Sequence, residues 1–324
     1  MNSTVKSALK IIFPLLLGAI LVWYSLRKIS FSELADYFVN ANYFWISLGV
    51  FFGLLSHLSR AYRWKYMLEP MGYSLRFSNG MMAVFSGYLI NYTVPRAGEV
   101  SRATILTNYE GVPFEKGFGT IVAERVADVL VMLFIIGFTL IWKFDIIYDF
   151  LIDDLDFQNQ LFILSPVALF LFYCFYQIIK KGNHPFLVRI RSFLIGFLEG
   201  VMSIFKMKYK WAFIAHTVFI WAMYVLMFYV TSLSIDSISQ LPFSAILIGF
   251  IAASFSVAAT NGGVGAYPLA VYAAFSIFNI EEVPSLAFGW IMWSSHTVMI
   301  VVMGGLSLVF LPIYNRLYQK KNKT

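Results

Sequence analysis

Long apolar runs, separated by short polar stretches, cover the chain from its first residues to its last. A helix of about 20 apolar residues crosses the roughly 30 Å hydrocarbon core of a bilayer. Six runs are interpreted as full spans, near residues 11–24, 43–59, 117–142, 161–179, 211–233 and 284–311. The pattern therefore predicts an all-α, polytopic integral membrane protein.

Two further apolar segments, near 77–95 and 242–280, are broken by Asn, Pro and Gly. Each is either a pair of short spans or a re-entrant hairpin that returns to its own side, which gives about eight membrane helices in total. The stretch from Leu269 to Ile280 has 12 residues, or about 18 Å of helix, against a core of roughly 30 Å. This length favours a re-entrant hairpin.

Composition excludes a pair of soluble domains, although 324 residues would be enough for two. Of these residues 60% are hydrophobic and 13% are charged, whereas soluble domains carry about 25% charged residues. A net charge of +7 would suggest a nucleic-acid partner for a soluble chain. In a membrane protein the excess of Lys and Arg reports orientation instead, because these residues favour the cytoplasmic side. We expect no nucleic-acid partner.

The distribution of Lys and Arg decides between the two arrangements of segment 77–95. A single crossing would put the acidic loop at 145–156 in the cytoplasm and the basic stretch at 180–210 outside, the reverse of the usual bias. With a hairpin, every Lys and Arg lies on the cytoplasmic side except Arg27, Lys28, Lys143 and the membrane-embedded Arg125. We predict a multi-pass protein of a bacterial-type inner (plasma) membrane, with both termini in the cytoplasm.

The same reasoning returns segment 242–280 to the outside, so that each half of the chain contains a span, a hairpin and a span. The halves, about 1–142 and 161–312, would form an inverted repeat within a single domain over 1–324. Inverted repeats with interrupted helices near the midplane recur in transporters. Residues 32–40 and 185–206 mix apolar and polar positions at helical spacing, which predicts amphipathic helices on the cytoplasmic surface.

The first candidate site lies at the break that ends segment 77–95. It contains Asn91, Pro95, Arg96, Gly98, Glu99 and Arg102. Pro95 stops a helix, and Gly98 permits unusual backbone angles. The spacing of three lets Arg96, Glu99 and Arg102 share one helical face. Because broken backbone at membrane depth survives only inside protein or beside a wet cavity, this segment is suited to holding an anionic group. The alternative is a cytoplasmic loop whose arginines contact lipid phosphates.

A second cluster, Glu124, Arg125 and Asp128, lies about two turns into the span at 117–142. Ionisable residues inside a bilayer are costly and usually mark a pathway or a buried pair. Arg125 and Asp128 can pair at a spacing of three, while Glu124 and Asp128 share a face and would repel each other. A further cation is implied, for which Arg96 or Arg102 is the natural candidate. The alternative is a closed ion-pair cluster that fixes the hairpin to the span.

The second break is the segment from Asn261 to Pro268, which contains Gly262, Gly263, Gly265 and Tyr267. Glycine lets backbone approach another element or a ligand closely, and helix N-termini would offer N–H groups to an anion. A close helix crossing at small residues is the alternative. The segment is a candidate site because its position in the second half corresponds to that of the first break in the first half.

Four motifs, taken in order and at these distances, resemble the lysylphosphatidylglycerol synthase transmembrane region, also called the flippase-like domain family. They are Arg60-Ala-Tyr-Arg63-Trp64, Asn91 with Pro95-Arg-Ala-Gly-Glu99 and Arg102, Glu124-Arg-Val-Ala-Asp128, and Gly262-Gly-Val-Gly265. The resemblance runs from about Asn40 to Phe310. It implies a polytopic domain that moves a lipid between leaflets, in some members fused to a soluble aminoacyl transferase, for which we expect no counterpart here. Pro268 stands where the family pattern commonly has an acid, so no acid-dependent role is expected there.

We hypothesise that the protein binds an anionic phospholipid head group and assists its passage between leaflets. Arg96, Arg102 and Arg125 would hold the phosphate, and Glu124 and Asp128 would balance the charge. The candidate substrate-binding residues are Arg60, Arg63, Asn91, Pro95, Arg96, Gly98, Glu99, Arg102, Glu124, Arg125, Asp128, Asn261, Gly262, Gly263, Gly265 and Tyr267. Without an ATP-binding motif, transport would be passive or coupled to an ion.

Two other classes stay open at this point. One is an accessory or regulatory subunit for a separately encoded lipid-modifying synthase or glycosyltransferase, and the other is an intramembrane lipid-modifying enzyme. No His-Glu-x-x-His motif is present, and the four histidines are scattered. The single Cys174 cannot form a disulfide framework or a thiolate cluster. We therefore expect no catalytic residue, metal or cofactor, while the lipid and the oligomeric state stay open.

Overall fold

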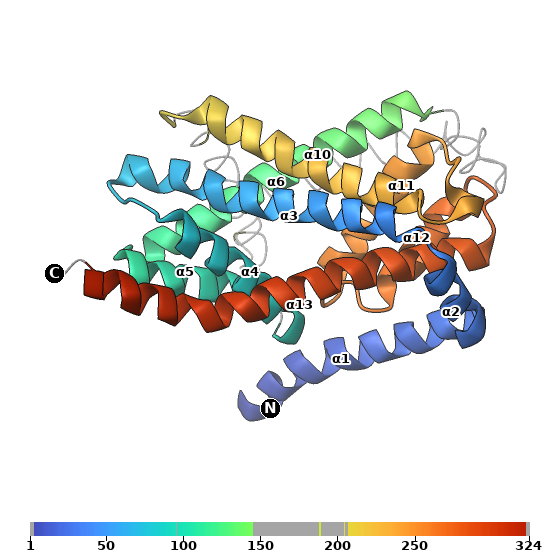
Figure 1. Cartoon of the computed structure of the whole chain (residues 1–324), viewed down its shortest axis with the longest axis horizontal. Coiled ribbons are helices and arrows are strands. Elements are labelled where there is room, and N and C mark those ends of the chain that lie inside the picture. Colours follow the sequence, from blue (N-terminus) through green and yellow to red (C-terminus); the bar gives the residue numbers. More distant parts are fainter. Residues whose placement is uncertain (1–2, 95, 145–187, 189–203, 205–206, 322–324) are drawn as a thin grey trace. The chain divides into compact units, whose positions relative to one another are not determined.

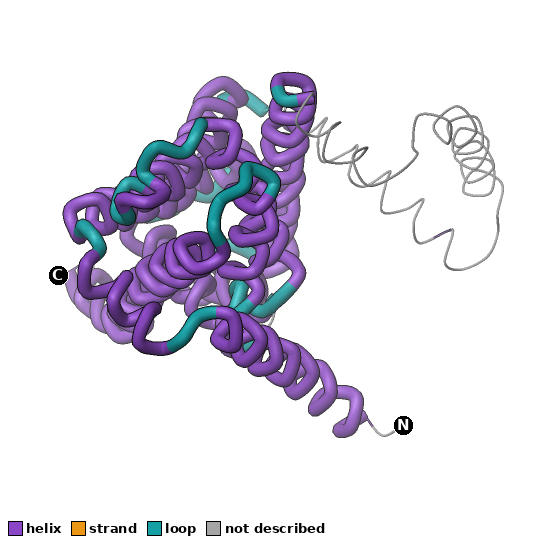
Figure 2. The backbone as a smooth tube through the Cα atoms, turned by 90° about the vertical axis from the view of Figure 1, so that its right-hand side faces the viewer, coloured by secondary structure: helices purple, strands orange, loops and turns teal. Residues whose placement is uncertain are grey.

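The computed structural model describes residues 3–94, 96–144 and 207–321 together with residues 188 and 204, and side chains from residue 16 onward. In chain order the helices are α1 (Ser3–Lys28), α2 (Phe31–Asn40), α3 (Tyr43–Leu68), η1 (Glu69–Met71), α4 (Phe77–Thr93), α5 (Ala97–Glu110), α6 (Phe114–Trp142), α10 (Lys210–Ser232), η2 (Asp236–Ile238), α11 (Phe243–Ala259), α12 (Ala266–Ser276) and α13 (Glu282–Lys321) (Figure 1). The all-α prediction is confirmed, because the described residues form helices and loops without a strand (Figure 2).

The predicted spans coincide with long helices wherever the chain is described. Those at 11–24, 43–59, 117–142, 211–233 and 284–311 correspond to α1, α3, α6, α10 and α13. In the described part of the chain, Tyr43–Met71, Lys210–Ser232 and Glu282–Lys321 are long and apolar enough to cross a membrane. The span at 161–179 and nearly all of the predicted amphipathic segment 185–206 lie outside the described residues.

Two compact units make up the chain. The first consists of residues 1–121 and 208–324, and the second of residues 122–207. Helix α6 begins in the first unit and continues into the second. The single domain over 1–324 and the inverted repeat stay predictions.

In the first unit, α4 and α5 form a hairpin that returns to the end where it began. At its closed end a Cβ on Gly98 of α5 would overlap the carbonyl oxygen of Gly87 of α4. At its open end Glu110, the last residue of α5, accepts a hydrogen bond from Asn79 in the first turn of α4 (2.5 Å). The prediction that residues 77–95 themselves enter and leave is therefore wrong in detail. They form a single limb, and the return limb is the more polar α5, whose charged and hydroxyl residues conceal it from a hydropathy scan.

Helices α11 and α12 form the second hairpin, and aromatic side chains fill its interior. The ring of Phe275 in α12 lies so close to Gly249 of α11 that a Cβ there would be 2.6 Å from it. Phe228 of α10 packs edge-on against Phe250, Phe275 and Phe288, with ring centroids 4.9 to 6.4 Å apart. With 17 and 11 residues, α11 and α12 extend about 25 and 17 Å, less than a roughly 30 Å core.

Helix α13 provides a common axis for both hairpins. It has 40 residues, or about 60 Å of helix. Helix α4 follows its C-terminal half, since Asn79 contacts Asn315 and a Cβ on Gly304 would meet Leu89. Helix α12 follows its N-terminal half, where Pro268 crosses α13 against Gly289. The hairpins thus approach each other from opposite ends of α13, the arrangement that an inverted repeat requires (Figure 1).

Helix α1 runs antiparallel to α13 and is joined to its beginning. Lys28 at the end of α1 pairs with Glu282 (2.5 Å), and the indole of Trp290 donates to Ser25 (3.1 Å). Because α1 approaches this end and α13 leaves it, the described termini of the chain point toward the same end. The side of the membrane that the termini face stays a prediction.

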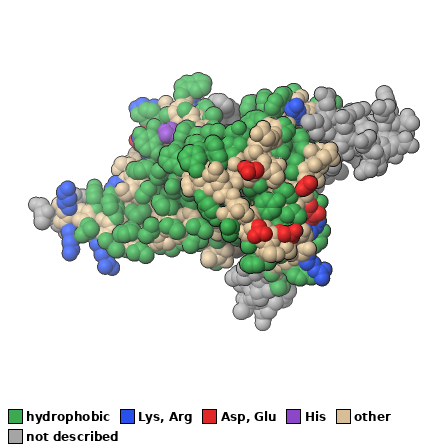
Figure 3. Space-filling model, turned by 45° about the vertical axis from the view of Figure 1, so that its right-hand side comes forward, with side chains coloured by type: hydrophobic (Ala, Val, Ile, Leu, Met, Phe, Trp, Pro, Cys, Tyr) green, Lys and Arg blue, Asp and Glu red, His purple; other side chains and the backbone are tan. Residues whose placement is uncertain are grey.

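Charge separates the two ends of the first unit. The end at the C-terminus of α13 carries Lys65, Arg76, Lys116, Arg316, Lys320 and Lys321 against Glu69, Glu110 and Glu115, while Glu33, Asp36, Asp236, Glu281 and Glu282 lie at the other end with Arg27 and Lys28. On the face shown in Figure 3, several Lys and Arg lie at the first end, Asp and Glu gather toward the second beside a few Lys and Arg, and apolar side chains cover much of the surface between.

Helix α2 lies at the acidic end, since it packs against the beginning of α13. Residues 32–40 and the C-terminal tail were both predicted to be cytoplasmic, yet they are at opposite ends of α13. The prediction for 32–40 is the one that the charge pattern contradicts.

Candidate functional site

The two helix breaks meet each other, although 169 positions separate them in the chain. The side-chain amide of Asn261, in the second break, donates a hydrogen bond to the backbone carbonyl of Tyr92, at the end of α4 (2.7 Å). The hydroxyl of Tyr92 in turn lies 3.2 Å from that of Thr297 on α13. A Cβ on Gly262 would be 2.6 Å from the Tyr92 ring. The tips of the two hairpins are therefore in direct contact beside the middle of α13.

Asn91 and Arg96 shape the first break. The side-chain oxygen of Asn91 accepts the backbone N–H of Gly98 (2.7 Å), and its NH₂ group faces the Glu99 carboxylate (3.4 Å). Arg96 is the N-cap of α5, with a φ of 63°, a conformation that non-glycine residues adopt only under constraint. Pro95 lies outside the described residues. Asn91 thus holds the first turn of α5 against the last turn of α4.

The prediction that Arg96, Glu99 and Arg102 share one helical face is confirmed for Glu99 and Arg102 only. Arg96 precedes the helix and its side chain is exposed, whereas Glu99 is half-buried and Arg102 is buried. Helical spacing applies only to residues with helical dihedrals, so a cap residue does not follow it. Glu99 and Arg102 share the inner side of the hairpin, and Arg96 does not.

Glycine dihedrals explain the second break. Gly262, Gly263 and Gly265 have φ values of 70°, 79° and 68°, which disfavour any residue with a Cβ. At Gly265 a Cβ would overlap the backbone of α1 at Val22, so this glycine marks a close helix crossing, the alternative considered for the segment. The carbonyl of Gly262 accepts the indole N–H of Trp293 on α13 (2.8 Å). Tyr267 is buried at the beginning of α12.

Three arginines of the first unit are buried. Arg60, Arg63 and Arg102 are 2%, 0% and 2% exposed. Arg63 donates to the hydroxyl of Thr217 on α10 (2.6 Å). The Arg102 guanidinium lies 4.3 Å from the ring centre of Trp64, a cation–π contact between α5 and α3. The family motif Arg60-Ala-Tyr-Arg63-Trp64 therefore places guanidinium groups inside the bundle.

The cluster on α6 is described within the second unit. Arg125 lies 3.7 Å from the Glu124 carboxylate and 3.5 Å from that of Asp128. Glu124 and Asp128 are buried, at 0% and 6% exposure. The predicted pairing of Arg125 with Asp128 is present in the structure. The further cation that was expected from Arg96 or Arg102 stays a prediction.

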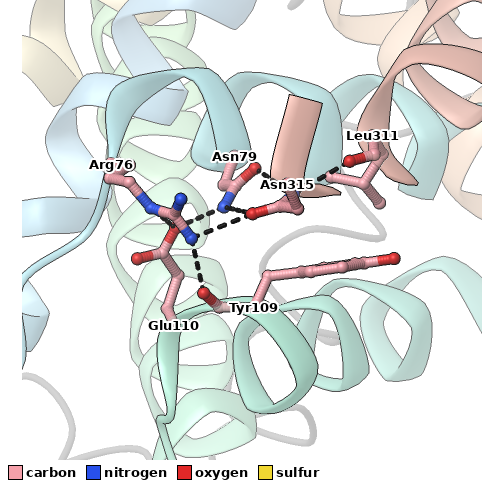
Figure 4. Close-up of polar contacts among 6 residues, drawn as sticks. All are labelled: Arg76, Asn79, Tyr109, Glu110, Leu311 and Asn315. Carbon is pink, nitrogen blue, oxygen red and sulfur yellow. Dashed lines mark hydrogen bonds and ion pairs between the residues drawn. The ribbon is translucent and has the colours of Figure 1, made fainter. Parts of the chain in front are cut away.

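A polar network at the open end of the first hairpin was missed by the sequence analysis (Figure 4). Arg76 pairs with Glu110 (3.0 Å) and donates to the carbonyl of Tyr109 (2.6 Å). Arg76 and Asn79 also donate to the side-chain oxygen of Asn315 (2.9 Å each). The network joins α4 and α5 to the last turns of α13. No motif predicts it, because its members come from three separate segments.

The histidine pair His57 and His296 was also missed as a unit. Their Nε2 atoms are 3.5 Å apart, one from α3 and the other from α13. Each histidine alone indicates only packing within a span, and their proximity depends on how α3 and α13 face each other.

Comparisons with known proteins agree with the motifs. The family model described as the lysylphosphatidylglycerol synthase TM region matches residues 11–305. The chain is similar to a UPF0104 membrane protein of Methanocaldococcus jannaschii, with 26% identity over 319 residues that cover 88% of each chain. The family match confirms the resemblance, although it begins before Asn40 and ends at residue 305 rather than near Phe310. The chain thus belongs to the lysylphosphatidylglycerol synthase transmembrane region family and is an integral membrane protein.

Proposed function

We propose that the protein binds the head group of an anionic phospholipid and assists its passage between the leaflets of the membrane. The observation that carries the proposal is the contact between the two hairpin tips through Tyr92 and Asn261. In this proposal each hairpin borders a path from its own side of the membrane, and the contact between the tips separates the two paths. A small movement at such a contact changes which side has access to the middle of the membrane.

Buried guanidinium groups favour an anionic substrate over a neutral one. A phosphate in an apolar core is costly unless it is paired and hydrogen-bonded. Arginine suits this role because its planar group offers five donors in a fork that matches phosphate oxygens. Arg102 lies against Gly87 within the first hairpin, and Arg63 lies on α3 next to Trp64, the ring that Arg102 contacts. In this proposal the head group reaches Arg102 and Arg63 when the packing around the first hairpin opens.

The orientation follows from the charges at the two ends. The basic end, which carries Arg316, Lys320 and Lys321, would face the cytoplasm, and the acidic end, which carries Glu281 and Glu282, would face outward. The first hairpin would then open to the cytoplasm and the second to the outside. A bacterial-type inner membrane, with both termini in the cytoplasm, is part of this proposal.

Leaflet exchange of a labelled lipid tests the proposal directly. Purified protein is reconstituted into vesicles that carry fluorescent phosphatidylglycerol, and a membrane-impermeant quencher reports the outer-leaflet fraction over time. We expect faster exchange than in protein-free vesicles. Exchange at the same rate in both would remove the transport proposal, and conversion of the lipid into a new product would favour an intramembrane enzyme instead.

Substitution of Arg102 tests whether lipid exchange depends on the buried arginines. We expect Arg102→Gln to slow the exchange by at least about tenfold, because loss of one charge-assisted hydrogen-bonding partner is worth about 1.5–3 kcal/mol. Arg316→Gln, at an exposed position of α13, is the matched control and should exchange lipid like the wild type. If Arg102→Gln does not fold, Arg102→Lys keeps the charge without the planar fork and should still slow exchange. Wild-type rates in a folded Arg102 variant would contradict this role.

A further inference from the structure

Two imidazole rings meet in the interior of the first unit. The Nε2 atoms of His57 on α3 and His296 on α13 are 3.5 Å apart. His57 is 0% exposed, whereas His296 is half-buried. His57 is therefore enclosed by protein, and His296 is the less buried ring of the two.

Aromatic rings surround the enclosed imidazole. Its centroid lies 4.7 Å from the ring of Tyr88 and 5.4 Å from that of Phe85, both on α4. Tyr224 of α10 approaches it at 5.9 Å. Aromatic side chains stabilise a nearby cation through their ring electrons. These rings contact the imidazole at tilted or edge-on angles and enclose it.

The chemistry of the pair limits it to one extra proton. Two neutral imidazoles form a single N–H···N hydrogen bond only when one carries its proton on Nε2 and the other on Nδ1. An added proton makes one ring a cation, which donates a charge-assisted bond to the remaining Nε2 lone pair. A second proton would place two like charges 3.5 Å apart at low dielectric.

The pair is adjacent to the contact between the hairpin tips. His296 precedes Thr297, whose hydroxyl lies 3.2 Å from that of Tyr92, and the Tyr92 carbonyl accepts the Asn261 amide. Among the described residues, Tyr88 of α4 and Tyr224 of α10 contact His57, and Arg60 follows it by three positions on α3. We expect a proton on the pair to add positive charge about one helical turn from Arg60 and so to weaken the packing of α3 against α13 and α4.

We propose that His57 and His296 form a proton-binding site that couples opening of the hairpin tips to the proton gradient. The proposal rests on the lipid-transport function above and names its coupling ion. In this proposal a proton enters the pair at His296, the less buried ring, and is shared with His57 across the Nε2–Nε2 contact. The tips separate while the pair is charged, and they close again when the proton leaves to the other side.

Lipid transport under an imposed pH gradient tests the coupling. Vesicles with fluorescent phosphatidylglycerol are prepared with and without a gradient of one pH unit, and an enclosed pH-sensitive dye records proton movement. One coupled proton permits at most about a tenfold change in the leaflet ratio of the lipid per pH unit. We expect wild-type protein to shift the ratio in this range, and His57→Gln and His296→Gln to exchange lipid without responding to the gradient.

His216→Gln is the matched control. The His216 ring lies 2.8 Å from the hydroxyl of Ser59, near the beginning of α10 and away from the hairpin tips. This variant should keep the wild-type response. Lipid exchange by the wild type that ignores the gradient, without proton movement, would overturn the coupling and leave the transport function standing. Absence of any exchange would overturn the transport function instead.

A direct titration separates the site from transport. Histidine side-chain NMR spectra of the purified protein are followed against pH. A shared proton predicts that replacing His57 by Gln moves the titration midpoint of His296, whereas His216→Gln leaves it in place. An unchanged His296 midpoint in a folded His57→Gln variant would contradict the shared site, whatever the vesicles show.

Discussion

Asn79 and Asn315 exchange a reciprocal pair of side-chain hydrogen bonds, each 2.9 Å long, between the first turn of α4 and the last turns of α13. Both side chains are buried, at 0% and 3% exposure. Asn315 also donates to the carbonyl of Leu311, and it follows Pro312, which interrupts the backbone hydrogen bonds of α13. The pair therefore fixes the first hairpin to the part of α13 that follows this interruption.

Replacing Asn315 by alanine should destabilise the protein. The change leaves the buried amide of Asn79 without its reciprocal partner, at a cost of about 1–3 kcal/mol. The measurement is thermal unfolding of the detergent-solubilised protein. Gln319→Ala, an exposed position one turn further along α13, should unfold like the wild type. Equal melting temperatures for Asn315→Ala and Gln319→Ala would show that the network contributes nothing to stability.

Two adjacent glycines of α13 should respond in opposite ways to alanine. A Cβ on Gly304 would be 2.6 Å from Leu89 and 2.9 Å from the carbonyl oxygen of Phe85, whereas a Cβ on Gly305 would meet nothing within 4 Å. Overpacking costs about 1–3 kcal/mol, so Gly304→Ala should lower the unfolding temperature. Gly305→Ala gains helix propensity and should unfold at or slightly above the wild-type temperature. The reverse order would contradict the contact between α4 and α13.

Alkaline pH should loosen the attachment of α1 to α13. The hydrogen bond to the Glu282 carboxylate (2.5 Å) raises the pKa of the Lys28 ammonium above its usual 10.5. A raised pKa means that the folded state binds the proton more tightly. The stabilisation is then fully present below about pH 10.5 and is lost as the pH rises through the raised pKa.

Comparison with Lys28→Gln isolates this contribution from the other groups that titrate at high pH. The difference in unfolding temperature between wild type and variant should be constant at neutral pH and should shrink above pH 10.5. A difference that does not change up to the highest pH would argue against the ion pair as the attachment.

Cysteine accessibility should report the two ends of the first unit. In a Cys174→Ser background, Asn108→Cys lies at the basic end of α5 and Ser237→Cys at the acidic end in η2, and both positions are exposed. A membrane-impermeant thiol reagent added to intact cells should label only Ser237→Cys, and both variants should react after lysis. Labelling of Asn108→Cys from outside would reverse the proposed orientation.

The amino-acid pattern alone predicts most of the fold and the protein family. The spans that correspond to α3, α10 and α13 follow from apolar run length, because the bilayer imposes that length on each helix separately. The breaks at residues 93–96 and 260–265 follow from Pro, Gly and Asn, which act locally on the backbone. Charge bias indicated that the first hairpin returns to its own side, although it did not show that α5 is the return limb.

Contacts between distant segments were decided only by the tertiary structure. Tyr92 with Asn261, Asn79 with Asn315, and His57 with His296 are separated by 169, 236 and 239 positions. Lipid tails solvate every apolar helix about equally well, so hydrophobicity does not determine which helices pack together. Small-residue packing and polar contacts between helices determine it instead. Gly98 against Gly87 and Gly304 against Leu89 set the distances at which those polar groups meet. A linear pattern records which residues are polar, but helix packing determines which of them meet.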